Sequence, residues 1–133
     1  MGKPAAKKGD QIIGIDIHIV MIPSPGGPIP TPLPSPFMGK IEQAVSPNVF
    51  INKKNAATFG SKAKNKPPHI PIGGPFQKPP KNESMVLIAS FTVSINGKPA
   101  ARDLDVCLDC NDPVDLPTGL IKVQGKSNVF IGG

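Results

Sequence analysis

The sequence contains no tryptophan and no tyrosine, only two cysteines and two histidines, and no long apolar run. The absence of tryptophan and tyrosine argues against nucleic-acid binding, because such sites usually stack bases on aromatic side chains set among basic residues. A membrane helix needs about 20 apolar residues, and the polar, basic amino terminus does not resemble a signal peptide. We therefore expect a cytoplasmic protein whose cysteines are reduced or bind metal instead of forming a structural disulfide.

Proline and glycine are abundant instead, with 18 and 14 residues in a chain of 133. This composition approaches that of unstructured sequence. However, isoleucine alternates with other residues in IGIDIHI at residues 13–19, the period of a half-buried strand, with His18 on the face opposite the isoleucines. Only residues 39–45 could form a turn or two of helix. We predict an all-β protein with long Pro/Gly-rich loops and a single domain at residues 1–133.

The formal net charge is +6, and the charges are unevenly distributed. Seven lysines occur between Glu42 and Glu83 with no acid among them, whereas five aspartates lie at residues 103–115 around the cysteines. A run of like charges usually forms a solvated face. We therefore expect no nucleic-acid partner.

A short motif occurs three times in the chain. The clearest copy is NGKPAAR at residues 96–102; GKPAAK at residues 2–7 nearly matches it, and NKKNAA at residues 52–57 keeps both alanines. Strand-like residues precede the second and third copies, and the lead-in that the first copy lacks occurs as SNVFIGG at residues 127–133. We therefore predict three strand-turn-Ala-Ala units, one of them completed by bringing the two ends of the chain together. Asn-Gly in the third copy is a strong hairpin signal.

The repeat places the histidines at one equivalent position. His18 and His69 each follow the second alanine of their unit by twelve residues, and Cys107 and Cys110 come just before that position in the third unit. A lone histidine in a strand is more often a satisfied or surface residue, and a redox Cys-x-x-Cys pair needs a helix start in a βαβ frame. Two imidazoles and two thiolates form a complete tetrahedral zinc set. We therefore expect a closed, structural zinc site that couples metal binding to folding.

Catalysis is poorly supported by the sequence. It contains no Gly-x-Ser-x-Gly motif, no phosphate-binding glycine loop and no HExxH motif, and both histidines are assigned to the metal. Asp16 or Asp109 could orient one of these histidines by a hydrogen bond. We expect no enzymatic activity.

The proline-rich segment PSPGGPIPTPLPSP at residues 23–36 must be extended, because proline fixes φ and biases the preceding residue away from helix. It could be a flexible linker or a ligand for proline-recognising domains. We expect a stiff loop packed on the body, because apolar residues follow it and it joins two segments of one repeat.

These features resemble the PAAR-repeat proteins, the pointed tips of type VI secretion systems and related contractile injection machines. Residues 99–102 are the PAAR tetrapeptide itself, and CNDP at residues 110–113 and NVFIG at residues 128–132 extend the likeness over nearly the whole chain. The resemblance implies a small conical β-hairpin domain with pseudo-threefold symmetry. Its base would sit on a trimeric VgrG-like spike, one tip per trimer, and its apex would bind zinc.

The family's usual zinc ligands are three histidines and one cysteine. His18, His69 and Cys110 match by position, and Cys107 or a water would complete the set. Ser35 stands in a proline-rich segment where relatives would carry a histidine.

The implied function is mechanical: the tip caps and sharpens the spike, which is assembled in the cytoplasm and ejected through the target membrane. We expect no fused effector domain, and a base that includes Phe50, Phe130 and Val93. The alternative is a cytosolic, zinc-stabilised adaptor that recruits partners through its proline-rich segment.

Overall fold

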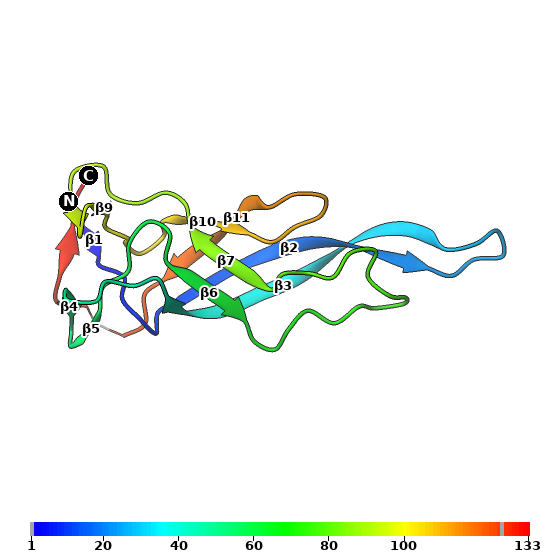
Figure 1. Ribbon diagram of the computed structural model, residues 1–133, viewed down its shortest axis with the longest axis horizontal. Helices are drawn as coiled ribbons and strands as arrows, with labels where there is room; N and C mark the ends of the chain where they lie inside the picture. Colours follow the sequence, from blue (N-terminus) through cyan, green and yellow to red (C-terminus); the bar gives the residue numbers. More distant parts are fainter. Residues whose placement is uncertain (1, 126) are drawn as a thin grey trace.

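The computed structural model describes residues 2–125 and 127–133 (Figure 1). These residues form twelve β-strands and no helix, so the all-β prediction is confirmed. Accordingly, none of them belongs to a helix long and apolar enough to cross a membrane. Residues 39–45, the only stretch where the sequence allowed a turn or two of helix, do not form one, because a strand continues to Gln43. The strands are β1 (Lys3–Pro4), β2 (Gln11–Ile22), β3 (Ile29–Gln43), β4 (Phe50–Ile51), β5 (Lys54–Asn55), β6 (Lys62–Asn65), β7 (Glu83–Val86), β8 (Ser94–Ile95), β9 (Lys98–Pro99), β10 (Val106–Asp109), β11 (Leu116–Lys122) and β12 (Phe130–Ile131).

Six of these strands close into a barrel built from three hairpins. The hairpins are the antiparallel pairs β2 with β3, β6 with β7, and β10 with β11. They join one another through β3 with β6, β7 with β10, and β11 with β2. Closure pairs the barrel strands on both sides, which removes open sheet edges where all six run together.

The β2–β3 hairpin extends far beyond the other two and forms the tapering end of the molecule (Figure 1). The two strands pair continuously out to Ile22 and Ile29. Residues 29–36 are therefore part of a strand, and the expectation that residues 23–36 form a loop was wrong for them. Only residues 23–28 connect the two strands.

Prolines occupy every second position from Pro30 to Pro36. They are compatible with this strand because their backbone nitrogens point away from β2. Their cross-strand partners include Ile17 and Ile19. The N–H groups of these partners turn away from β3 and donate to the side chains of Asn111 (2.6 Å) and Asp112 (2.9 Å). In an antiparallel pair the proline nitrogens opposite them also point away, so no hydrogen bond between β2 and β3 is lost.

Three two-stranded sheets lie at the other end, close to both chain termini (Figure 1). Two of them are tight hairpins, β4 with β5 and β8 with β9, whereas β1 pairs with β12 from the opposite end of the sequence. Asn96 and Gly97 have φ of 54° and 77°, the positive values that a two-residue type I′ hairpin turn requires. The hairpin predicted from Asn-Gly is confirmed, and the pairing of β1 with β12 is the one that the displaced lead-in predicts.

The Ala-Ala motifs meet at one junction. The amide of Ala6 donates to the carbonyl of Ala101 at 2.9 Å, Ala101 donates to Ala57 at 3.0 Å, and Ala57 donates back to Ala6 at 3.0 Å. These three hydrogen bonds form a closed cycle among the three units. The preceding alanine of each unit also makes one equivalent bond, to the carbonyl of a valine in its lead-in. All six alanines are completely buried, so larger side chains would not fit in the junction.

Apolar side chains, including Ile12 and Phe37, fill the barrel next to this junction. Farther along β2, the inward-facing residues are Asp16 and His18, both buried, whereas Ile15 is largely exposed. His18 therefore lies on the face opposite the isoleucines, as predicted, and that polar face is the buried one. The interior changes from apolar to polar toward the tapering end.

Candidate metal centre

Four buried side chains, Asp16, His18, His69 and Cys110, bring their ligand atoms within 4.8 Å of one another. His69 Nε2 lies 2.8 Å and Cys110 Sγ 3.3 Å from Asp16 Oδ2, and His18 Nε2 lies 3.7 Å from Cys110 Sγ. The two imidazole rings are centred 4.8 Å apart. The prediction from the repeat register that the histidines meet is confirmed, and this group could hold a metal ion.

All three units contribute to the group. Asp16 and His18 are alternate residues of β2 and therefore point to the same face. His69 lies in the segment after β6, and Cys110 directly follows β10. The group thus connects segments that are far apart in the sequence.

A carboxylate stands behind His18. His18 Nδ1 lies 3.6 Å from Asp112 Oδ2, and that oxygen also accepts the Ile19 N–H at 2.9 Å. Burial lowers the pKa of His18, and the neighbouring His69 lowers it further. His18 therefore favours the neutral form, which is the form that binds metal.

A side-chain amide stands behind His69. Asn65 Nδ2 lies 3.1 Å from His69 Nδ1, and Asn65 Oδ1 accepts the Met38 N–H at 2.9 Å. The backbone N–H of His69 donates to Asn82 Oδ1 at 2.7 Å. His69 is therefore fixed through both its ring and its main chain.

A second buried carboxylate, Asp109, lies next to Asp16 inside the barrel. Burial and the nearby Asp16 raise the pKa of Asp109 to about 8, although Ser84 donates a hydrogen bond to it. A Cβ atom added at Gly14 or Gly119 would overlap this carboxylate. Glycine at these two strand positions therefore makes room for Asp109.

The thiol of Cys110 is protonated in this environment. Burial raises its pKa to about 12, and the negative charge of Asp16 contributes in the same direction. A bound metal cation favours the thiolate, so metal binding at this group would release a proton.

The residues present fit a metal ion. Four buried side-chain atoms in and around the group have no hydrogen-bond partner among the described residues, which is uncommon in folded proteins, and a cation held by the group would compensate the buried carboxylate of Asp16. Two imidazoles, one thiolate and one carboxylate are donor types that suit zinc. With four protein donors, such a site is closed and structural. The four atoms are Asp16 Oδ1, His18 Nδ1, Asp109 Oδ2 and Asp112 Oδ1.

Three of the four predicted ligands come together, and Cys107 does not join them. Cys107 is buried in the apolar cluster, where burial raises the pKa of its thiol and Sγ lies 3.9 Å from the Asp105 carbonyl. The fourth donor of the group is Asp16, which the sequence suggested only as a partner that orients a histidine. Its place two residues before His18, on the same strand face, was the available signal. Ser35 is its cross-strand partner on β3.

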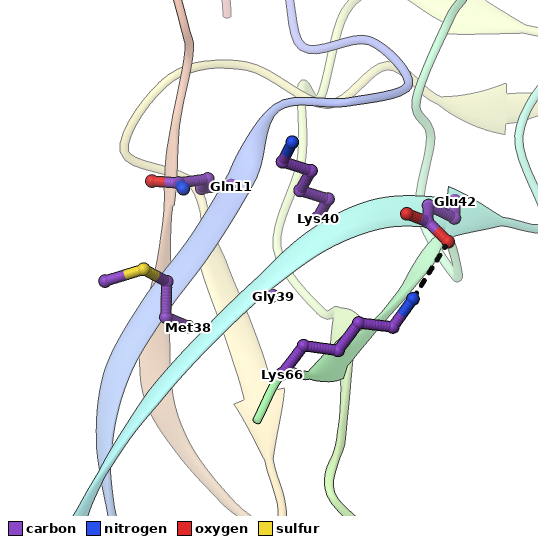
Figure 2. Close-up of a pocket in the computed structure, with 6 residues that line it drawn as sticks. All are labelled: Gln11, Met38, Gly39, Lys40, Glu42 and Lys66. Atoms are coloured by element: carbon purple, nitrogen blue, oxygen red, sulfur yellow. Dashed lines mark ion pairs between the residues drawn. The ribbon is translucent and has the colours of Figure 1, made fainter. Parts of the chain in front are cut away.

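A separate surface hollow of about 370 Å³ lies along β2 and β3 (Figure 2). Lys66 reaches across it to Glu42, with 3.8 Å between Nζ and the carboxylate. Its lining contains no histidine or cysteine, and its charged residues are two lysines and one glutamate. The lining residues are Gln11, Met38, Gly39, Lys40, Glu42 and Lys66.

Comparison with known proteins identifies no relative: no protein-family model, no curated protein and no solved structure matches the chain.

Proposed function

We propose that the chain is a PAAR-like structural tip that caps the trimeric VgrG-like spike of a type VI secretion or related contractile injection machine. The observation that carries this proposal is the closed cycle of hydrogen bonds among Ala6, Ala57 and Ala101. A cycle of equivalent bonds is what three units around a pseudo-threefold axis would make. A single chain with such an axis can match a partner that has threefold symmetry.

The end that carries the three small sheets is the proposed base. Phe50 and Phe130 are 56% and 63% exposed there, and Val93 is 36% exposed. Phe50 and Phe130 occupy equivalent strand positions, in β4 and β12. Contiguous exposed apolar surface marks an interaction site, and two phenylalanines exposed at equivalent strand positions of this end are what supports a spike-binding role for it.

The tapering end is the proposed apex, with zinc as its structural ion. When bound, zinc would neutralise the Cys110 thiolate and the Asp16 carboxylate. Asp16, His18, His69 and Cys110 would then tie β2 to the segments that follow β6 and β10. The function requires no chemistry beyond this. The chain would assemble on the spike in the cytoplasm and leave with it when the machine contracts.

The alternative, an adaptor that recruits partners through its prolines, receives less support from the fold. A proline-recognising domain binds an accessible polyproline II segment. Here residues 29–36 are paired with β2 throughout, so docking of that kind would require the hairpin to separate.

Co-purification with a candidate spike trimer tests the proposal. We expect one chain per three spike subunits by light scattering, and one zinc per chain by mass spectrometry on the same sample. Phe50→Asp combined with Phe130→Asp should abolish the complex. Ile72→Asp is the matched control, because Ile72 is 73% exposed on the segment between β6 and β7, away from the proposed base (Figure 1). A complex that survives the double substitution would refute the assignment of the base, and failure of the wild-type chain to bind the spike would refute the function.

A further inference from the structure

The two histidines of the metal group differ in what faces their outer ring nitrogen. His18 Nδ1 faces the carboxylate of Asp112 at 3.6 Å, and a carboxylate accepts hydrogen bonds. His69 Nδ1 faces the side-chain amide of Asn65, with Nδ2 at 3.1 Å. An amide can donate or accept, so the orientation of Asn65 decides where the proton of His69 can reside.

Three backbone and side-chain contacts fix that orientation. Asn65 Oδ1 accepts the Met38 N–H at 2.9 Å, and a backbone N–H can only donate. Asn65 Nδ2 also lies 3.5 Å from Asn82 Oδ1, an atom whose acceptor role is set by the His69 N–H at 2.7 Å. If the amide were turned over, its NH2 group would face the Met38 N–H, which places two donors together. Its oxygen would face Asn82 Oδ1, which places two acceptors together. Asn65 therefore donates to His69 Nδ1.

We propose that Asn65 is a positioning residue that holds the proton of His69 on Nε2. Because Nδ1 accepts a hydrogen bond, it carries no proton, and the neutral ring must then carry its proton on the other nitrogen. Nε2 lies 2.8 Å from Asp16 Oδ2 and donates to it. Both ring nitrogens of His69 are thus satisfied in the metal-free protein.

This inference rests on the proposed metal site and concerns how that site is filled. Ligation through Nε2 requires a lone pair on that atom, so the proton must move to Nδ1, where Asn65 currently donates. Loading therefore requires Asn65 to lose its hydrogen bond to His69, and the amide can accept the Nδ1 proton only by turning over and also losing its bond to Met38. His18 has no such requirement, because Asp112 can accept a proton carried on Nδ1. The chain accordingly holds one histidine ready for metal and the other in a competing hydrogen-bonded form.

The consequence is that Asn65→Asp should tighten metal binding. Aspartate has nearly the same shape as asparagine, and its oxygens can accept from both the Met38 N–H and a proton on His69 Nδ1. It would supply the carboxylate that often supports a metal-binding histidine, a contribution worth 10- to 100-fold in affinity. We expect the affinity for Zn²⁺ to rise by about 10-fold or more.

Two measurements test the proposal. In metal-free wild-type protein at pH 8, long-range ¹H–¹⁵N correlation spectra of the imidazole rings should show His69 protonated on Nε2; a proton on Nδ1 would overturn the proposal. Asn65→Asp should move that proton to Nδ1 and should bind Zn²⁺ more tightly in competition with a chromophoric chelator. Unchanged or weaker binding by a folded Asn65→Asp variant would contradict it.

Asn128→Asp is the control for the added charge. Asn128 is exposed and comes just before β12, in one of the three small sheets, whereas the metal group belongs to β2 and to the segments after β6 and β10; its substitution should leave zinc affinity unchanged. If Asn65→Asp does not fold, the wild-type spectrum alone decides the proposal. The absence of zinc from native protein would count against the proposed metal site, whereas the spectrum of the metal-free protein tests Asn65 separately.

Discussion

Replacing each cysteine by serine tests which of the two is the proposed zinc ligand and which is a residue of the apolar core. Cys110 lies in the metal group and Cys107 in the apolar cluster. We expect Cys110→Ser to lose zinc, because a hydroxyl is a much poorer zinc ligand than a thiolate. Cys107→Ser should retain one zinc per chain, since its sulfur is not among the grouped donors.

The two variants should also differ in how their stability depends on zinc. At a free zinc concentration 100 times the Kd, a bound ion stabilises the folded state by about 2.7 kcal/mol. For a chain of this length this corresponds to a rise of roughly 10 °C in the melting temperature. Cys110→Ser should lose that rise. Cys107→Ser buries a hydroxyl among apolar groups, which costs about 1–3 kcal/mol, and this cost should be the same with and without zinc.

Thermal unfolding of the wild-type protein and both variants, with zinc and with a chelator, measures the difference directly. The zinc-dependent shift is the decisive quantity, because a general loss of stability affects both conditions equally. A zinc-dependent shift that survives in Cys110→Ser, or disappears in Cys107→Ser, would refute the assignment of Cys110 as the ligand and Cys107 as a core residue.

Three further predictions concern the scaffold. Gly119→Ala would push a methyl group into a buried carboxylate and should lower the free energy of unfolding by about 1–3 kcal/mol, whereas Gly26→Ala, with open space around it, should change chemical denaturation little. Pro32→Thr combined with Pro34→Thr adds N–H donors to the outer edge of β3. The variant should keep the fold and associate with itself in a concentration-dependent way, as measured by light scattering. A variant that stays monomeric at all concentrations would contradict this prediction. Burial raises the pKa of the Cys107 thiol above its ordinary value of 9.0. The stabilisation that comes from keeping this thiol protonated is therefore complete below about pH 9 and is lost as the pH rises further. In the presence of a chelator, Cys107→Ala should lose less stability than wild type between pH 8 and pH 10, and equal losses would contradict this.

The all-β class followed from the alternation of isoleucines in the sequence, and the meeting of the histidines followed from the repeat, because a repeat carries three-dimensional information. Once three units share a register, residues at the same count from the alanines occupy equivalent places, and His18 and His69 were found in this way. Counting from the alanines does not show whether Cys107 or Asp16 supplies the fourth donor of the metal group. Three residues of extended strand span about 10 Å, so Cys107, in β10, and Cys110, just after it, cannot act as a Cys-x-x-Cys chelate formed in a turn.

The strand at residues 29–36 was missed because proline was taken as a sign of a loop. Proline excludes a residue from a strand only where its nitrogen must donate. At residues 29–36 every second nitrogen faces away from β2, and within the described part of the chain no strand pairs with β3 on that side. Local composition cannot show which edge of a strand is unpaired, so this part of the fold depended on tertiary context.

The unequal lengths of the three hairpins explain why the interior becomes polar where it does. β2 and β3 have 12 and 15 residues, whereas β6, β7 and β10 have four each. Beyond the end of the shorter strands, neighbouring segments cannot be held to β2 by a continuous ladder and must be attached through side chains. Asn111 and Asp112 provide such attachments by accepting the amides of Ile17 and Ile19. The metal group lies at the same level of β2, on its inward face, and a cation there would attach the segment after β6 as well. The position of the site is therefore a consequence of extending one hairpin past the barrel, which is also what gives the molecule its tapering end.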